Sequence, residues 1–278
     1  MTRITKLTNE NYYSAQANKW YMSASQYKAF DRCEAAALAE LRGEWKRPDS
    51  IALSVGSYID SYFSDELEQF KVANPDIYKR DGGLKAEYIT AHNTAERLER
   101  DELARMLLAG KHQVIKTGQI GGVWFKAKFD SLLSAAQVER ICKKFPAVRD
   151  LVPLGGGMIV DLKYMRDFEP IWDDEAREKV GFINYWGYDI QGAIYQALDG
   201  NFSPFVIVAA TKEAEPDFEA FNIPDGDLAY CLAEIETKAP RYRDIKLGKI
   251  APIGCGKCAY CRREKKLNEI KIYQSITL

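Results

Sequence analysis

The chain has 278 residues, 46% of them hydrophobic and 28% charged, and its 39 basic and 40 acidic side chains leave a formal net charge of −1. This profile excludes a disordered or fibrous protein, and the length corresponds to one large domain or to a domain with an appendage, with enough residues for a full hydrophobic core. No apolar run reaches the roughly 18 residues that cross a bilayer, and the first residues lack the apolar stretch of a secretory signal. We therefore expect an intracellular, cytoplasmic protein with no membrane partner and with reduced cysteines.

The first part of the chain, residues 1–110, is predicted to be mainly helical. A helix with Ser23 as its N-cap extends to Cys33. A second helical stretch covers residues 56–69. A third covers residues 85–108, where Ala, Leu and Met recur at three-to-four spacing among Glu and Arg.

From residue 114 the hydrophobic period changes to two, which is typical of strands. A Gly-Gly pair at 121–122 separates two such runs and predicts a hairpin, whose second strand ends at Asp130. Its apolar side chains alternate with polar ones, so the two kinds lie on opposite faces. A later short strand, residues 158–163, places Asp161 and Lys163 on one face and apolar residues on the other.

Further helices and strands alternate along the rest of the chain. The predicted helices cover 135–150, 185–198 and 227–238, and the predicted strands cover 204–211, which reads as buried on both faces, and 220–224. An acidic segment at 173–175 is interpreted as a loop. The pattern indicates an α/β fold with its core at 111–235 and a basic, cysteine-containing tail at 236–278, in a single domain spanning 1–278.

Two aspartates on neighbouring strands suit a divalent metal. Asp130, Asp161 and the backbone carbonyl of Leu162 offer the hard oxygen ligands that Mg²⁺ and Mn²⁺ prefer. Lys163 would point into the same pocket, where it could orient an attacking water and offset charge on a phosphate. The alternative is a solvated strand face on which Asp and Lys pair. Charged residues inside so apolar a strand argue for the metal, because buried charge is costly unless paired or bound to a cation.

Gln191 and Tyr195 lie four residues apart on a predicted helix and therefore share a face. An amide and a phenol can both hydrogen-bond a phosphate or a terminal nucleotide. The alternative is a surface glutamine beside a tyrosine that only packs.

Three thiols lie within seven residues in the tail. Cys255, Cys258 and Cys261 form a C-x2-C-x2-C pattern in a polar, basic segment, which packing does not explain and which predicts a metal or cluster site. Cys33 is the best candidate for a fourth ligand, because Cys142 and Cys231 lie among apolar residues of predicted helices. Four thiolates suit either Zn²⁺ or a [4Fe-4S] cluster, and the site would tie the first helices to the tail.

The tail is also strongly basic. Between Lys238 and Lys271 it carries eleven basic and three acidic residues, a net charge of +8 on a nearly neutral protein. Tyr242 and Tyr260 are interleaved with these cations, which favours contacts to phosphates with occasional base stacking. The alternative is a solvated tail.

The order of Asp130, Asp161-x-Lys163 and Gln191-x3-Tyr195 resembles the PD-(D/E)XK nucleases of the branch that contains RecB, lambda exonuclease and RecE. The segment from Tyr21 to Phe30 and the cysteine-rich tail look like a phage-type, RecE-like exonuclease family. Cys33 together with the tail cysteines further resembles the iron-sulfur nucleases of the AddB type.

The resemblance implies a restriction-endonuclease-like fold, with a mixed central sheet flanked by helices. It also implies a metal-dependent DNA exonuclease of phage or prophage recombination and repair, acting on linear duplex ends or single strands, with a single-strand annealing protein as partner. Asp130, Asp161 and the Leu162 carbonyl would hold Mg²⁺ or Mn²⁺, Lys163 would position the water, and Gln191 and Tyr195 would hold the DNA end.

Two departures from the family pattern leave alternatives open. The family carries a histidine in a Gly-x3-His helix, whereas the matching stretch from Gly56 here offers Asp60, a carboxylate that can still ligate a divalent metal. The second gap in the cysteine triplet is also shorter than in the iron-sulfur relatives. A catalytically impaired, metal-stapled DNA-binding protein on the same scaffold is the alternative function.

Overall fold

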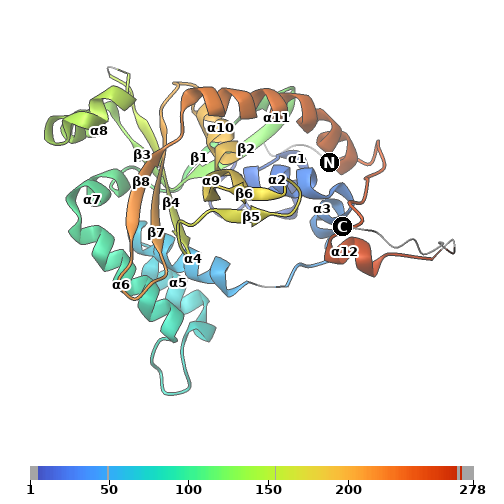
Figure 1. The fold of residues 1–278 in the computed structure, drawn as a ribbon, viewed down its shortest axis with the longest axis horizontal. Coiled ribbons are helices and arrows are strands. Elements are labelled where there is room, and N and C mark those ends of the chain that lie inside the picture. The colour runs from blue at the N-terminus through green and yellow to red at the C-terminus, as the bar shows by residue number, and fades with distance from the viewer. Residues whose placement is uncertain (1–5, 49, 154, 268–269, 271–278) are drawn as a thin grey trace.

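The computed structural model describes residues 6–48, 50–153, 155–267 and 270. Within these residues a mixed sheet lies between two groups of helices, as Figure 1 shows. The helices are α1 (Ala15–Trp20), α2 (Ala24–Arg32), α3 (Glu34–Leu41), α4 (Ile51–Phe63), α5 (Leu67–Ala73), α6 (Ala86–Arg100), α7 (Glu102–Leu108), α8 (Ala135–Lys144), α9 (Phe182–Tyr185), α10 (Tyr188–Asp199), α11 (Asp225–Lys246) and α12 (Ala259–Arg263), with 3₁₀ turns at Pro75–Ile77 and Pro146–Leu151. The strands are β1 (Val114–Ile120), β2 (Val123–Phe129), β3 (Ser131–Leu133), β4 (Met158–Met165), β5 (Ile171–Asp173), β6 (Glu178–Val180), β7 (Phe205–Thr211) and β8 (Phe218–Asn222).

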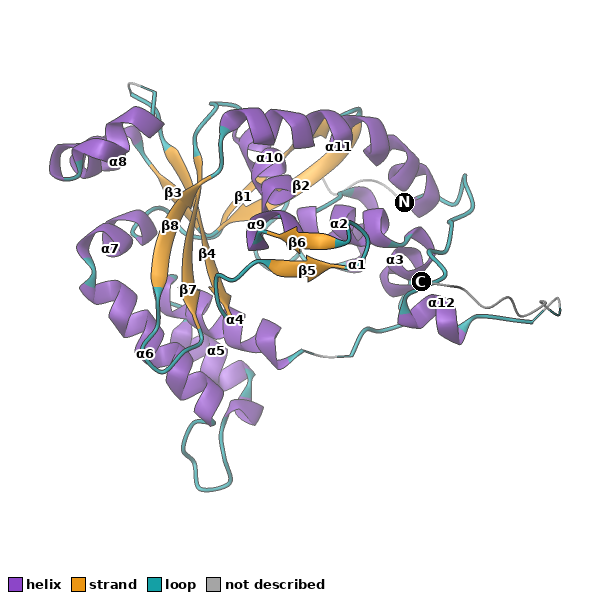
Figure 2. Ribbon diagram, viewed as in Figure 1, coloured by secondary structure: helices purple, strands orange, loops and turns teal. Residues whose placement is uncertain are grey.

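The main sheet has the strand order β3-β4-β7-β8. Strands β4 and β7 are parallel, with Asp161 opposite Ile207, while β3 and β8 pair antiparallel at the two edges. All seven residues of β7 are buried, so the predicted strand with two covered faces is confirmed. The predicted mixed central sheet flanked by helices is confirmed as well, as Figure 2 shows.

Each face of this sheet packs against its own hydrophobic core. Ile159 and Ile207 belong to a core shared with α2, α10 and α11, whereas Val160 and Val208 belong to a second core formed with α6, α7 and α8. Alternation along β4 therefore sends successive side chains into different layers. Asp161 points to the first layer, where α10 covers the sheet.

The predicted hairpin is present as β1 and β2, joined by Gly121 and Gly122 at positive φ. Two consecutive residues with positive φ are characteristic of the tight turns that match strand twist. A side chain at Gly121 would also lie within 2.6 Å of the Glu236 carbonyl oxygen, so glycine is required there on both counts.

Several helix boundaries differ from the sequence prediction. The predicted helix at 85–108 is two helices, because the Asp101 carboxylate caps α7 by accepting a hydrogen bond from the Ala104 N–H at 2.9 Å. The stretch predicted at 56–69 contains the end of α4, at Phe63, and the start of α5, at Leu67. Helix α11 continues past the predicted end at residue 238 and includes Pro240, because buried residues beyond it, Tyr242 and Ile245, hold the helix against the core. The acidic segment interpreted as a loop contains the small β5–β6 hairpin.

None of the helices in the described part of the chain is both long and apolar enough to span a lipid bilayer.

A buried lysine fastens the end of α11 to the N-terminal segment. Lys246 Nζ donates hydrogen bonds to the Tyr21 carbonyl at 2.9 Å and to Gln26 Oε1 at 2.8 Å, and neither acceptor carries a negative charge. Burial, assisted by repulsion from the nearby Lys126, lowers the pKa of Lys246 from 10.5 to about 7.

This lysine predicts a pH dependence of stability. Between pH 7 and 10.5 the unfolded chain holds a proton on Lys246 that the folded protein lacks, so its contribution to the free energy of unfolding rises with pH. A Lys246→Met variant lacks this contribution. We expect the melting temperature of the parent, relative to that of Lys246→Met, to increase between pH 7 and pH 9.5. A difference that stays constant over this range would contradict the assignment.

Candidate active site

A cleft of about 680 Å³ opens between α1 and α2 on one side and α4 and α5 on the other. Its lining includes all six side chains proposed from the sequence for the carboxylate site, namely Asp60, Asp130, Asp161, Lys163, Gln191 and Tyr195. Leu162 borders a small adjoining cavity together with Asp60 and Asp130. The fold thus gathers residues that are as much as 135 positions apart in the sequence.

Four elements present these side chains, namely α4, the end of β2, β4 and α10. Asp60 lies in the last turn of α4, and Asp130 directly follows β2. Asp161 and Lys163 lie two residues apart in the middle of β4, so both face the cleft. The Leu162 N–H between them donates a hydrogen bond to Asp130 Oδ2 at 3.2 Å, which fixes the first carboxylate beside the second.

Asp161 is the most enclosed of the carboxylates, with 1% of the residue exposed. Its Oδ1 accepts a hydrogen bond from Gln191 Nε2 at 2.7 Å, and its Oδ2 forms an ion pair with Lys163. Lys163 Nζ also lies 5.1 Å from the centre of the Tyr188 ring. The lysine is therefore held by a carboxylate and an aromatic face while its end still reaches the cleft.

The three carboxylates repel one another. Burial, together with the charge of Asp161, raises the pKa of Asp60 to about 7 against the opposing effect of Lys163. Burial and the charges of Asp161 and Asp60 raise the pKa of Asp130 well above its ordinary value. Burial alone would lower the pKa of Lys163, but Asp161 and Asp130 more than offset this effect and raise it. The raised pKa values of Asp60 and Asp130 reflect the cost of holding three negative charges close together in a buried site, and a bound cation would lower that cost.

The donor set fits a hard divalent ion. Oδ2 of Asp161 is buried and accepts no hydrogen bond of normal geometry from any residue that the structure describes, its ion pair with Lys163 aside. Such an oxygen, beside two further carboxylates, matches the all-oxygen ligation of Mg²⁺ or Mn²⁺. Asp60, Asp130, Asp161 and the Leu162 carbonyl are the groups available to hold it.

Gln191 and Tyr195 lie on the face of α10 that covers β4 and β2. Gln191 is bonded to Asp161, and the Tyr195 hydroxyl donates to the Lys128 carbonyl at 3.2 Å while its ring packs on Phe129. In this arrangement both side chains position the strands that carry the carboxylates. Their contact with DNA stays a prediction.

Sequence reasoning missed several residues that line or support the cleft. Lys28 donates to the Trp186 carbonyl at 3.0 Å, and burial and repulsion from Lys163 lower its pKa to about 8. The sequence indicates only that Lys28 lies on the polar face of α2. His112 Nδ1 donates to the Asp130 carbonyl at 2.8 Å, a contact that no spacing along the chain reveals.

The N-terminal segment also forms part of the cleft wall. Tyr12 and Tyr13 line it, and the buried Lys126 holds this segment by donating to the Tyr12 carbonyl and, at 2.7 Å, to Asn18 Oδ1. Lys126 belongs to the strand face that the sequence analysis predicted to be polar, yet only 1% of it is exposed. The hydrogen bonds of its amino group, rather than a hydrophobic contact, hold the N-terminal segment against β2.

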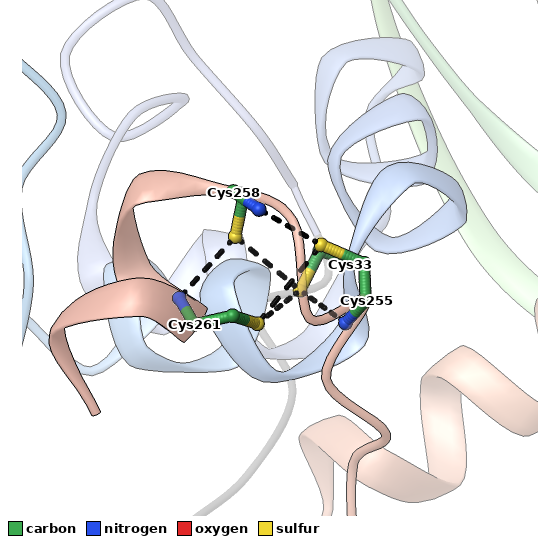
Figure 3. A group of neighbouring side chains, drawn as sticks. All are labelled: Cys33, Cys255, Cys258 and Cys261. Atoms are coloured by element: carbon green, nitrogen blue, oxygen red, sulfur yellow. Dashed lines mark hydrogen bonds between the residues drawn. The ribbon is translucent and has the colours of Figure 1, made fainter. Parts of the chain in front are cut away.

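Figure 3 shows a second cluster, in which four cysteines converge from distant parts of the chain. Cys33 lies at the junction of α2 and α3, Cys258 caps α12, Cys261 lies within α12, and Cys255 precedes it. All four Sγ atoms lie within 4.8 Å of one another, with separations of 3.6 Å for Cys33 and Cys261 and 3.8 Å for Cys258 and Cys33. Backbone N–H groups point at the sulfurs, as from Cys258 to Cys255 Sγ at 3.3 Å. The arrangement can hold a metal ion.

The basic tail differs from its sequence-based interpretation. Tyr242 is buried, and its hydroxyl donates to Asp31 at 2.8 Å, so it is unavailable for stacking on a base. Arg241 pairs with Glu34 and Lys257 with Glu175, carboxylates that lie far away in the sequence. The excess positive charge counted along the tail is therefore partly neutralised by the rest of the fold. Lys271 lies outside the described residues.

A mixed sheet that carries Asp130 and Asp161-x-Lys163 at one cleft defines a domain of the PD-(D/E)XK nuclease class. The chain belongs to the family described as a PDDEXK-like domain of unknown function (DUF3799), whose model matches residues 23–139 and 143–264. The class predicted from the order of the motifs is confirmed.

A solved structure supports the same assignment. The chain is similar to the crystal structure of a protein from Eubacterium rectale described as "Putative exonuclease", at 38% sequence identity and a TM-score of 0.81. The similarity covers 96% of this chain and 97% of that one. No curated protein matches the sequence.

Proposed function

We propose that the protein is a Mg²⁺- or Mn²⁺-dependent deoxyribonuclease that hydrolyses phosphodiester bonds from DNA ends. The observation that carries the proposal is the buried Asp161, which lies between Gln191 and Lys163 and faces Asp130 and Asp60 across one cleft. A divalent ion bound there would supply Lewis-acid activation of the phosphate and of a water.

The side chains of this protein would then divide the remaining work. Asp130, Asp161 and the Leu162 carbonyl would hold the ion, with Asp60 as a further ligand in place of the family histidine. Lys163, kept protonated by the two aspartates, would orient the attacking water and offset the charge that develops on the phosphate. Gln191 would keep Asp161 in place, and Tyr195, with Gln191, would border the bound DNA end.

The action on DNA ends and the biological role are inferred from similarity to other proteins. Action on ends is supported by similarity to the Eubacterium rectale protein described as "Putative exonuclease". The roles in phage or prophage recombination and the annealing-protein partner rest on the resemblance of the motifs, and the cytoplasmic location rests on the hydropathy of the sequence; all three stay predictions. We also retain the division into a helical part (1–110), a catalytic core (111–235) and a cysteine-containing tail (236–278) within one nuclease domain.

The test is a degradation assay on linear and circular duplex DNA, with Mg²⁺, with Mn²⁺ and with EDTA. We expect metal-dependent loss of the linear form, persistence of the circle and no reaction in EDTA. Loss of both forms would identify an endonuclease instead. Loss of neither form, despite measurable DNA binding, would favour the alternative of a catalytically impaired binding protein and make Asp60 the first position to replace by histidine.

At the cysteines the geometry favours Zn²⁺ over an iron-sulfur cluster. Zn–S bonds of about 2.3 Å in a tetrahedron separate the sulfurs by about 3.8 Å. Cysteines on the four corners of a [4Fe-4S] cluster bind different irons and lie roughly 6 Å apart. Three of the six pairs of Sγ atoms lie 3.6 to 3.9 Å apart and all six lie within 4.8 Å, which is closer to the spacing around a single tetrahedral ion than to that around a cluster.

A further inference from the structure

We propose that a second groove, continuous with the cleft, guides one single strand of DNA past the catalytic carboxylates. The proposal rests on the proposed nuclease function. The groove, here called the α1–α3 groove, has a volume of about 600 Å³ and runs between α1, α2 and α3. It shares Tyr13, Asn18, Ser25 and Gln26 with the catalytic cleft, so the two form one path.

The charge along this path suits a nucleic-acid backbone. Arg42 and Arg47 line the end of the groove away from the cleft, and both side chains are about half exposed. Glu40 is the one carboxylate among the described lining residues, and it already accepts a hydrogen bond from Arg47 at 2.8 Å. Exposed ion pairs of this kind contribute little to stability, so a phosphate can compete for the guanidinium.

The basic path continues beyond the groove. Arg42 also borders a smaller cavity of about 330 Å³, lined by Lys249 and Tyr260 of the tail and by Glu44, whose carboxylate lies 4.0 Å from the Arg42 guanidinium in an exposed ion pair. By contrast, a pocket of about 270 Å³ bordered by α2, α10 and α11 is lined by Asp31, Asp189, Asp227 and Glu234 and contains no basic residue among the described side chains. That pocket would repel a phosphate backbone. Of these two surfaces, the α1–α3 groove is therefore the one whose charge suits DNA.

An aromatic side chain stands where the groove meets the cleft. Tyr13 is 69% exposed, although its ring packs edge-on against Tyr12 at 4.9 Å and lies 5.1 Å from Lys128 Nζ. These contacts hold the ring in place while most of its surface stays open. An exposed, fixed aromatic ring in a basic groove is the arrangement on which unpaired bases stack, whatever their sequence.

The size of the groove favours a single strand as the occupant. Cavities of roughly 300 to 1,000 Å³ hold ligands of drug size, a class that includes one or two nucleotides. The cleft and the groove in series therefore accommodate a short run of nucleotides. Stacking on Tyr13 requires unpaired bases, which a duplex does not present along its length.

The experiment measures binding of a fluorescent 12-nucleotide single strand by anisotropy, in an Asp161→Asn background that leaves the probe intact. In the Arg42→Ala/Arg47→Ala double variant we expect roughly tenfold weaker binding, and a salt dependence reduced by about 1.4 in slope because two phosphate contacts are lost. Tyr13→Ala should weaken binding by about 5-fold to 100-fold, with little change in that slope. Arg105→Ala is the matched control, because Arg105 is exposed on α7 at the opposite end of the molecule from α3 in Figure 1.

Several outcomes would overturn the groove. One such outcome is that the groove variants bind the single strand as tightly as Arg105→Ala does. Another is that they lose as much affinity for a blunt hairpin duplex as for the single strand, which would make a duplex the occupant. Unchanged melting temperatures show that the variants are folded. If the parent binds no DNA, both proposals fail. If the groove variants weaken binding but the parent cleaves DNA with neither Mg²⁺ nor Mn²⁺, the groove stands and the nuclease proposal fails.

Discussion

Replacement of Asp161 by asparagine is expected to reduce DNA cleavage by roughly a thousandfold or more, equivalent to about 4 kcal/mol of transition-state stabilisation. Asparagine keeps the shape of the side chain and can still accept the hydrogen bond from Gln191. It removes the charge that holds Lys163 and would bind a cation. DNA binding should persist, because the cleft loses a negative charge that repels phosphate. Initial rates of degradation in Mg²⁺ and anisotropy with a labelled strand measure the two effects.

Asp199 offers a matched control for this substitution. It is also a buried aspartate with a lysine partner, Lys116 at 3.4 Å, but it does not line the cleft. Asp199→Asn should lower the melting temperature and leave the rate of cleavage by the folded protein unchanged. Cleavage by Asp161→Asn at the rate of Asp199→Asn would refute the assignment of the cleft as the catalytic site.

Loss of the thiol at Cys33 is expected to have the largest effect on stability. In a Cys33→Ser variant the bound zinc should fall from one ion per chain toward none, and the melting temperature should fall by more than about 10 °C. The physical reason is that four thiolates bound to one ion would close a loop of more than 220 residues, so the free energy of metal binding would also be free energy of folding. Metal analysis of the purified protein and thermal unfolding test this expectation.

The control is Cys231→Ala. Cys231 is a half-buried cysteine of α11 that lies outside the cluster. Its zinc content should equal that of the parent. A brown parent protein that contains iron and absorbs near 400 nm would overturn zinc in favour of a cluster. If the parent protein is purified without metal and the Cys33→Ser variant is as stable as the parent, there is no metal site at the cysteines.

Local patterns in the sequence predicted the parts of the fold that local interactions decide. The Gly-Gly pair at 121–122 and the unbroken apolar run of β7 carry their structure in a few residues, and both are present. The β5–β6 hairpin was missed because each strand has three residues, too few to show a period. Asp101 divides the long charged helix through a single capping bond, which composition does not reveal.

The candidate site was predictable to the extent that its residues share one strand or helix. Asp161 and Lys163 lie on one face of β4 because a strand has a period of two, and Gln191 lies near Tyr195 because a helix places residues four apart together. The positions of Lys28, Tyr13 and His112 depend on packing between distant segments. Burial of Tyr242 depends in the same way on Asp31, 211 residues earlier.

Helix α2 joins the two clusters, because Ser25, Gln26 and Lys28 line the cleft and Cys33 follows directly at its end. This connection has a consequence for biosynthesis. Cys33 leaves the ribosome more than 220 residues before Cys261, so this wall of the cleft is translated early, packs on the core and α11 first, and would gain the thiol-bound ion as its last anchor. A chain interrupted before Cys255 would contain Asp60, Asp130 and Asp161 but would lack the three tail thiols that are proposed to join Cys33 at the end of α2.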